Sequence, residues 1–577
     1  MDESRHAHFF NPAHSLDRAA FAHPSRTSLW YGERSWSVAQ AAQTTEQLAA
    51  WMTEQGVRAG DRVMIVSRNS PYHLLLHVAC ARIGAVEVLV SYRLTRPEIE
   101  ELLEFTDPAL VVADPETASG GLFGERVCAV IDDDDLAQLP EGLAPPAGAL
   151  EAALADGWIG LSAGYQAVSG ARKSEGAQAT MAAQALNVHE YPEGLGAILF
   201  TSGSAGAPKA VGLTYEQLWW GSRNFREGFE YSNWDVELVV APLTHIGGFN
   251  GTTTDLFAHG GTVVVVREFR PAYVLEQIEA RRVAMMFGVP TMYAAMLNDP
   301  SFAQRDLRSF TRPLTGGAVA PAELLTRMDA AGLHVLNVWG MTETSASGCY
   351  LSAENLGWKA GSIGRPFAHT EARVVIPETG EDAGIGESGE LWLRGPSVVT
   401  EYWNSPDLNV RRPLAGEPAD REREALQGEE GRYLFAESED GAPWLCTGDV
   451  VRLDSDGFLW VVGRLHELIN TGGEKVSPNE VMRALAQYPG VSDCAVVGIP
   501  DAKWGEAVAV ALVMQPDAEP PSLDELRAFG ARELADYKLP HALLVLDHFP
   551  TNANGKIDRA TLAQQFESEN GTGGQVL

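Results

Sequence analysis

A short stretch at residues 201–209 combines hydroxyl, glycine and lysine residues in a way that suits polyphosphate binding. It reads Thr-Ser-Gly-Ser-Ala-Gly-Ala-Pro-Lys and follows the apolar run 195–200, which is typical of a buried strand. Backbone N–H groups and hydroxyls can donate to phosphate oxygens, and a lysine adds positive charge. The stretch is not a Walker A loop, because Pro208 precedes Lys209 and no serine or threonine follows it. Taken alone, it also fits an ordinary turn after a strand.

Further motifs with chemically useful residues follow this loop in a fixed order. They are Thr315-Gly316-Gly317-Ala318, Trp339-Gly340-Met341-Thr342-Glu343, Thr447-Gly448-Asp449, Gly463-Arg464-Leu465-His466-Glu467, Gly472-Gly473-Glu474-Lys475 and Asn554-Gly555-Lys556-Ile557-Asp558-Arg559. Together with the loop they resemble the motifs of the AMP-forming adenylating superfamily, which includes acyl- and aryl-CoA synthetases, peptide-synthetase adenylation domains and luciferases. The pattern is most similar to that of acyl-CoA synthetases.

The resemblance assigns expected roles in ATP binding. The phosphate-contacting residues it implies are Thr201, Ser202, Gly203, Ser204, Gly206 and Lys209. The adenine and neighbouring nucleotide contacts it implies are Gly316, Gly317, Ala318, Trp339 and Gly340. Thr342 is expected to bond the α-phosphate, and Glu343, with Thr201, to hold Mg²⁺, a hard cation that prefers oxygen ligands.

The remaining nucleotide and catalytic roles are expected at the carboxyl-terminal motifs. Asp449 and Arg464 are expected to contact the ribose, and Lys556 to bridge the substrate carboxylate and the α-phosphate during adenylation. Taken singly, Glu343, Asp449 and Lys556 also fit a capping carboxylate, a turn residue and a surface lysine.

The segment 243–249 resembles the part of the family in which a histidine or aromatic residue gates the acid pocket. His245 is therefore expected to act in catalysis, although a histidine satisfied within the core is the alternative. Amino-acid-activating relatives carry an aspartate in this region and this chain has none, which counts against an α-amino acid. Phe249, Trp339, Trp219 or Trp220 could wall the pocket with aromatic surface, which favours an aryl or medium-sized acid.

The expected fold class is α/β. Alternating strand and helix patterns predict strands at 61–66, 86–90, 110–113, 262–266 and 283–287, and a helix at 74–83. After Gly463 the pattern restarts, with strands at 495–498 and 508–513 and a helix at 523–534. We therefore expect a large multi-subdomain N-terminal domain of layered sheets and helices at 1–462, and a small mobile α+β C-terminal domain at 463–577.

The resemblance implies that the small domain rotates about His466 between two half-reactions and brings Gly472 and Gly473 to the CoA thiol tunnel. The segment 411–442 is densely charged and looks like an insertion whose expected form is a solvated loop. The segment 135–190 carries no motif and is expected to form surface helices and loops.

Composition limits the partners. A net charge of −34 argues against nucleic acid and against anionic lipid surfaces. No apolar run reaches the length of a membrane span, so we expect no membrane insertion. The five cysteines are scattered without a CxxC pair, which suggests reduced thiols in the cytoplasm and no zinc site. The sequence does not decide whether the protein forms a homodimer.

The motifs together predict an AMP-forming ligase with ATP, Mg²⁺ and CoA as cofactors and a small carboxylic acid as substrate. The acid is activated as an acyl-adenylate and then transferred to CoA. Two alternatives within the superfamily change the acceptor: nitrite-dependent diazotisation of an aromatic amine, or loading of a separate carrier protein. An alternative of another class is a catalytically silent ATP-binding protein.

Overall fold

The structure is a computed structural model, and its description covers most of the chain. The described residues are 10–121, 123–124, 126–132, 139, 143–171, 194–201, 209–318, 320–377, 379–412, 434–471, 474–501, 503–516, 518–551, 557–569 and 575–576. The chain forms two compact units. The first comprises Met1–Ala372 and Leu393–Leu445, and the second comprises Arg373–Trp392 and Cys446–Leu577. The boundary expected at 462/463 stays a prediction.

A seven-stranded sheet carries the phosphate-loop strand. Its strand order is β7-β6-β5-β3-β4-β8-β9. The strands are β3 (Arg62–Val66), β4 (Val86–Val90), β5 (Leu110–Ala113), β6 (Val127–Val130), β7 (Ile159–Gly160), β8 (Leu195–Thr201) and β9 (Lys209–Thr214). Neighbouring strands are parallel except for the final pair, β8 and β9, which is antiparallel. The predicted strand–loop–lysine sequence therefore sits at the edge of a sheet.

A nine-stranded sheet, in the order β16-β15-β14-β13-β12-β10-β11-β1-β2, holds most of the remaining motifs. Its strands are β1 (Thr27–Tyr31), β2 (Arg34–Ser37), β10 (Val236–Val239), β11 (Thr262–Val265), β12 (Met285–Gly288), β13 (Arg312–Gly316), β14 (Leu336–Trp339), β15 (Cys349–Leu351) and β16 (Arg365–Pro366). The short β-branched and apolar strands β11 and β12 each pair in parallel with β10, and they are buried, as the sequence predicted, except at half-buried Phe287 of β12.

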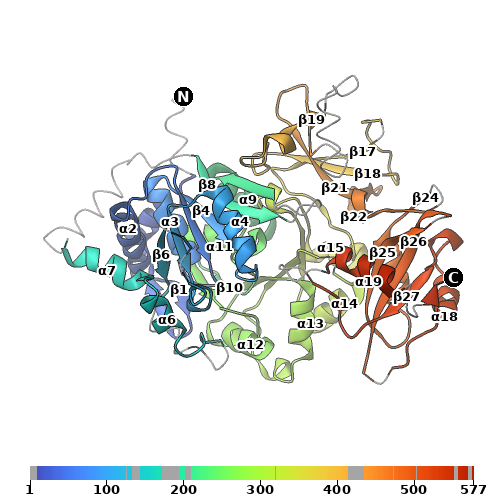
Figure 1. Cartoon of the computed structure of the whole chain (residues 1–577), viewed down its shortest axis with the longest axis horizontal. Coiled ribbons are helices and arrows are strands. Elements are labelled where there is room, and N and C mark those ends of the chain that lie inside the picture. Colours follow the sequence, from blue (N-terminus) through green and yellow to red (C-terminus); the bar gives the residue numbers. More distant parts are fainter. Residues whose placement is uncertain are drawn as a thin grey trace. The chain divides into compact units, whose positions relative to one another are not determined.

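Helices accompany these two sheets in chain order. They are α1 (Pro12–Ala22), α2 (Val38–Glu54), α3 (Tyr72–Ile83), α4 (Arg96–Thr106), α5 (Pro115–Ala118), α6 (Ala149–Ala155), α7 (Leu161–Ala171), α9 (Tyr215–Phe229), α10 (Ile246–Phe249), α11 (Thr253–Ala258), α12 (Pro271–Ala280), α13 (Pro290–Asn298), α14 (Ala322–Ala330) and α15 (Ala353–Lys359). Figure 1 shows α2, α3, α4 and α6 in the blue and teal part of the chain that also contains β4 and β6.

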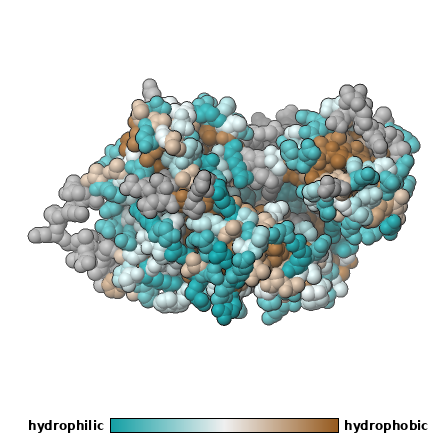
Figure 2. All heavy atoms as spheres, turned by 90° about the horizontal axis from the view of Figure 1, so that it is seen from below, coloured by the Kyte–Doolittle hydropathy of each residue, from teal (hydrophilic) through white to brown (hydrophobic). Residues whose placement is uncertain are grey.

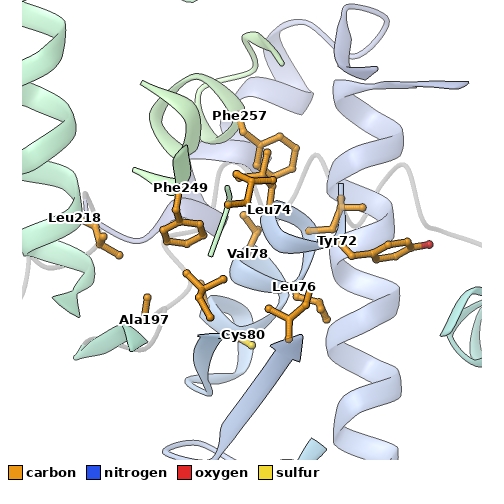
Figure 3. Packing of buried hydrophobic residues seen from close by; sticks show 14 of the residues in the cluster. Tyr72, Leu74, Leu76, Val78, Cys80, Ala197, Leu218, Phe249 and Phe257 are labelled. Atoms are coloured by element: carbon orange, nitrogen blue, oxygen red, sulfur yellow. The ribbon is translucent and has the colours of Figure 1, made fainter. Parts of the chain in front are cut away.

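Helix α3 is buried along almost its whole length and organises the core. It packs against α2 and against β4 and β8. Figure 3 shows its side chains gathered with Ala197 of β8, Leu218 of α9, and Phe249 and Phe257 of the short helices α10 and α11. The same core cluster contains side chains of both sheets, such as Leu199 of β8 and Val239 of β10. Burial of this apolar surface stabilises the strands, which position the loops that follow them.

A six-stranded sheet follows in the chain. Its order is β17-β18-β21-β20-β19, with β22 also paired to β21. The strands are β17 (Glu371–Val375), β18 (Ser388–Arg394), β19 (Arg411–Arg412), β20 (Phe435–Ala436), β21 (Trp444–Leu453) and β22 (Leu459–Arg464). The expected solvated loop at 411–442 is thus wrong at its two ends, where β19 and β20 pair and Phe435 is fully buried. Its middle, 413–433, lies outside the described residues.

The carboxyl-terminal part is an α+β unit with its own core. A second six-stranded sheet contains β23 (Ile469–Thr471), β24 (Glu474–Val476), β25 (Val491–Asp501), β26 (Gly505–Met514), β27 (Ala542–Val545) and β28 (Gln575–Val576). Helices α17 (Pro478–Leu485), α18 (Leu523–Gly530) and α19 (Arg559–Glu569) accompany it, and Figure 1 labels the last two. The helix expected at 523–534 ends earlier, at Gly530. Gly530 lies close to α17, because a Cβ built on it would be 2.9 Å from the Leu485 side chain.

The surface is mostly polar. Among the residues drawn in colour in Figure 2, hydrophilic ones cover most of this face and hydrophobic ones form separate patches. In the described part of the chain, none of the helices has both the length and the apolar composition that crossing a bilayer requires.

Candidate active site

Three of the predicted site segments follow the carboxyl ends of neighbouring parallel strands. β10, β12, β13 and β14 are adjacent and parallel in the nine-stranded sheet. The chain leaves β10 toward His245, β13 at Gly316 and β14 at Trp339. Open α/β sheets bind ligands outside the carboxyl ends of such strands. The fold therefore brings the expected acid-gating and adenine-binding segments to one sheet edge.

Two glycines of these segments are required by close backbone approach. A Cβ at Gly316 would lie 2.5 Å from the carbonyl oxygen of Val338, and one at Gly340 would lie 2.0 Å from that of Ala346. Gly317, with φ +75°, adopts the left-handed conformation that glycine tolerates best. Gly317 and Ala318 are exposed, so their backbone is accessible to a nucleotide base.

Glu343 is a buried carboxylate with a defined donor. It lies in a single 3₁₀ turn, Thr342–Thr344, and is 4% exposed. The hydroxyl of Tyr402 donates to its Oε1 at 2.8 Å, and the backbone N–H of Val399 donates to its carbonyl oxygen at 2.8 Å. Thr342 is 5% exposed beside it. Both side chain and main chain of Glu343 are thus oriented before any ligand binds.

The turn after Glu343 holds two strained residues. Ser345 and Ala346 have φ values of 51° and 72°, which non-glycine residues rarely adopt. The Asn250 side chain donates to the carbonyl oxygen of Ser345 at 3.2 Å, and the Ser345 hydroxyl donates to the carbonyl oxygen of Ser397 at 2.9 Å. Since Asn250 caps the helix that His245 begins, the acid-gating segment is bonded to the Glu343 turn.

Of the two strands that flank the phosphate loop, β9 contacts this turn. Thr201 ends β8 and pairs with Lys209, the first residue of β9, and β9 contacts the 3₁₀ turn of Glu343. Lys209 is 6% exposed, so its charge is held in a largely dry environment. The Thr201 hydroxyl is buried and has no hydrogen-bond partner among the described residues.

This donor set fits Mg²⁺. The Glu343 carboxylate is buried, and its turn contacts β9, whose first residue pairs with Thr201 of β8, which carries the unpartnered hydroxyl. Both groups supply hard oxygen ligands, and Mg²⁺ commonly binds one or two protein groups and takes its remaining ligands from substrate phosphates and water. Glu343 and Thr201 are the residues that would hold the ion.

His245 lies at a tightly built turn. It caps α10, and its Nδ1 accepts from the backbone N–H of Gly247 at 3.4 Å. The side chain of Asn69 holds the preceding residues, because its Oδ1 accepts from the N–H of Leu243 at 2.8 Å and its Nδ2 donates to the carbonyl oxygen of Ala241 at 3.0 Å. Half-buried Phe287 of β12 lies within 2.7 Å of a Cβ built on Gly247.

The aromatic wall proposed from sequence is partly wrong. Phe249 is 0% exposed and packs edge-on against His77 with 5.0 Å between ring centroids, so it belongs to the core shown in Figure 3. Phe249 is buried because it lies on the four-residue helix α10, which packs into the same core as α3. The amino-acid composition of this segment does not show that the ring faces the core. Trp219 and Trp220 are half-buried and contact each other edge-on, and Trp339 is half-buried at the end of β14.

In the second unit, the expected ribose residues face each other across two strands. Asp449 of β21 is opposite Arg464 of β22, and their Oδ1 and Nε atoms are 2.7 Å apart. The preceding Gly448 donates its N–H to the carboxylate of Glu390, and Thr447 donates its hydroxyl to the carbonyl oxygen of Leu391. The Asp449 carboxylate is thus buried and fixed, while Arg464 stays 45% exposed.

Other expected site residues lie outside the described residues. They are Ser202, Gly203, Ser204, Gly206, Gly472, Gly473 and Lys556, together with the side chain of His466. The backbone of His466 is described and lies in a 3₁₀ turn, Leu465–Glu467.

One residue that sequence reasoning missed is Tyr402. Its hydroxyl bonds the Glu343 carboxylate from a position 59 residues away, and no local pattern connects the two. Asn69 was missed for the same reason, since its side chain bonds backbone groups of a loop 172 to 174 residues away.

Comparison with known proteins places these features in context. Residues 16–403 match the model of the AMP-binding enzyme family, and residues 480–556 match that of the AMP-binding enzyme C-terminal domain. A feruloyl-CoA synthase of Amycolatopsis sp. is 32% identical over 95% of this chain and 98% of its own length. An indoleacetate–CoA ligase of Aromatoleum aromaticum is 31% identical over 95% and 97%.

Among solved structures, the o-succinylbenzoate CoA synthetase of Bacillus subtilis, in complex with an acyl-adenylate intermediate, is similar with a TM-score of 0.72. It is 26% identical and covers 95% of this chain and 97% of its own.

Proposed function

Because this chain belongs to the family of AMP-binding enzymes, we propose that it is an AMP-forming ligase that joins an aryl carboxylic acid to CoA. The carrying observation is the buried Glu343 carboxylate, oriented by Tyr402 and next to the phosphate strand β9, at the sheet edge where the His245, Gly316 and Trp339 segments meet. The relatives named for feruloyl and indoleacetate substrates both act on acids with an aromatic ring, which supports an aryl acid here.

In the first half-reaction, a carboxylate oxygen of the acid attacks the α-phosphorus of ATP, and the bond to pyrophosphate breaks. Lys209 and the phosphate loop hold the leaving phosphates, and Thr342 donates to the α-phosphate. Bound Mg²⁺ would neutralise negative charge on the phosphate oxygens. Gly316, Gly317 and Ala318 receive the adenine, Asp449 and Arg464 the ribose hydroxyls, and Lys556 bridges carboxylate and α-phosphate.

In the second half-reaction, the thiol of CoA attacks the carbonyl carbon of the acyl-adenylate, and AMP leaves. We assign the mobile domain to 463–577, with His466 as the hinge, so that Lys556 serves the first step and Gly472 with Gly473 lines the thiol path in the second. Glycine suits that place, because it lets the backbone approach a ligand closely.

We also place the enzyme in the cytoplasm. All five cysteines are free and buried, which suits a reducing compartment. A homodimer stays a prediction that light scattering after size exclusion would test.

A panel of aryl and aliphatic acids, scored by pyrophosphate release with and without CoA, tests the proposal. We expect release with aryl acids and faster turnover when CoA is present, since CoA discharges the adenylate. If none of the acids in the panel supports pyrophosphate release, acid activation is contradicted. If ATP is consumed only when nitrite and an aryl amine are supplied, the acceptor is nitrite chemistry and not CoA.

A further inference from the structure

Tyr402 makes a specific contact with the proposed metal carboxylate. Its hydroxyl donates to Glu343 Oε1 at 2.8 Å, and both side chains are about as buried as core residues, with 4% of each residue exposed. A hydrogen bond to a charged group is stronger than one between neutral groups. One oxygen of the carboxylate is thus used for orientation, which leaves lone pairs of the carboxylate for a cation.

The backbone of Tyr402 is held on both sides. Its N–H donates to Asn409 Oδ1 at 2.6 Å, and its carbonyl oxygen accepts from Asn409 Nδ2 at 2.9 Å. The next residue, Trp403, donates its N–H to the carbonyl oxygen of Ala210 in β9 at 2.9 Å. Ala210 directly follows Lys209, so Tyr402 is tied to the strand that carries the phosphate-binding lysine.

The ring of Tyr402 is also fixed. Phe435 of β20, which is fully buried, meets it edge-on with 5.7 Å between ring centroids. On another side, the Nζ of Lys209 lies 5.9 Å from the ring centroid, at the edge of the range for a cation–π interaction. The hydroxyl therefore has little freedom to leave Glu343.

We infer that Tyr402 is a positioning residue that orients the Glu343 carboxylate for Mg²⁺ and couples it to the Lys209 strand that binds phosphate; this rests on the proposed function. Groups that orient a metal ligand commonly raise metal affinity 10- to 100-fold. Tyr402 does not touch substrate in this role. It acts through Glu343.

The Tyr402→Phe variant tests the inference, because it keeps the ring between Phe435 and Lys209 and removes only the hydroxyl. The readout is binding of a fluorescent ATP analogue, without acid, as Mg²⁺ is titrated. We expect the Mg²⁺ concentration for half-saturation to rise about tenfold, while the KM for the acid in pyrophosphate release stays unchanged. The matched control is Tyr72→Phe, which removes a buried tyrosine hydroxyl bonded to Tyr165 in α7, and its Mg²⁺ titration should match the wild type.

A double variant separates positioning from general stability. Once Glu343→Gln has removed the carboxylate, adding Tyr402→Phe should shift the Mg²⁺ titration no further, since the two residues act as one unit. An unchanged titration in Tyr402→Phe, a shift equal to that of Tyr72→Phe, or additive shifts in the double variant would each overturn the inference. If the wild-type enzyme binds Mg²⁺ and ATP but activates no acid, the proposed function is overturned. The Mg²⁺ titration of Tyr402→Phe still tests the role of Tyr402, because it is measured without acid.

Discussion

Glu343 is the residue proposed here to hold Mg²⁺, and its carboxylate is buried and bonded by Tyr402. Glu343→Gln keeps the shape of the side chain and its bond from Tyr402 but removes the negative charge that a hard cation needs. We expect pyrophosphate release to fall and the Mg²⁺ concentration for half-maximal rate to rise by at least about tenfold. A rate measured across a magnesium titration checks this. A variant with the wild-type magnesium curve would remove Glu343 from the metal site.

Lys556 is expected to serve only one of the two half-reactions. Lys556→Ala should slow adenylation on the order of 10²–10³-fold, by analogy with loss of one transition-state donor. Thioester formation from preformed adenylate and CoA should stay largely intact. Measuring both steps in the same preparation decides the matter: an equal loss in both would show that the lysine does not divide them.

The site residues differ in how far the sequence could predict them. Thr342 and Glu343 belong to one contiguous motif, and Gly316 and Gly317 belong to another, so local sequence was enough to single them out as candidates. The structure places the two motifs after the neighbouring parallel strands β13 and β14. Tyr402 depends on a tertiary contact over 59 residues, which no periodicity reports. Phe249 was misassigned because an aromatic residue near a pocket motif has the same sequence signal whether it faces the pocket or the core.

Among the elements, the turn that joins β14 to Glu343 leaves no room for an added side-chain atom at Gly340. A Cβ at Gly340 would lie 2.0 Å from a backbone oxygen, so Gly340→Ala must displace the turn rather than a flexible side chain. We expect loss of adenylation together with destabilisation of about 1–3 kcal/mol, as for overpacking elsewhere. Activity and urea unfolding measure the two effects.

Gly357→Ala is the control for this prediction. Gly357 lies in α15, and a Cβ there meets no atom within 4 Å. Because alanine favours a helix by about 1 kcal/mol over glycine, this variant should keep its activity and gain or retain stability. Comparable losses in both variants would show that the tight fit at Gly340 is not what matters.

Element types were predicted better than element ends. The strands expected at 61–66, 86–90 and 110–113 appear as β3, β4 and β5, because buried parallel strands leave continuous apolar runs in the sequence. The two-residue strands β19 and β20 were missed, since such short segments form only through pairing with a neighbour. The expected solvated loop accordingly gave way to strands at its ends.

For the molecule as a whole, a buried acid makes stability depend on pH. Burial raises the pKa of Glu237 to about 8, against the opposing effect of hydrogen bonds from Thr252 and Thr253. The folded state thus keeps a proton that the unfolded state releases above its ordinary pKa of 4.5. Folding stability should therefore fall as pH rises between about 4.5 and 8, with a contribution of up to about 1.4 kcal/mol per pH unit.

Glu237→Gln tests this linkage, because glutamine is neutral at every pH and similar in shape. The free energy of unfolding of wild type and variant is measured by urea unfolding at pH 5, 6, 7 and 8. We expect the free energy of the wild type to fall more between pH 5 and pH 8 than that of the variant. Parallel dependences on pH would mean that Glu237 is ionised in the folded protein.

The family and the α/β class followed from motifs and alternating patterns, and the comparisons over nearly the whole chain confirm both. The identity of the acid did not follow, because the side chains that line a substrate pocket take their orientation from tertiary packing, as buried Phe249 does, rather than from local sequence.

Product analysis tests the central claim most directly. The enzyme is incubated with ATP, Mg²⁺, CoA and an aryl acid such as ferulate or indoleacetate, and AMP and acyl-CoA are quantified together by liquid chromatography and mass spectrometry. We predict one thioester for each AMP formed, with an acyl-adenylate detectable when CoA is omitted. AMP formation without any thioester, or ATP consumption that needs nitrite and an aryl amine instead of CoA, would contradict the assignment as an acid–CoA ligase.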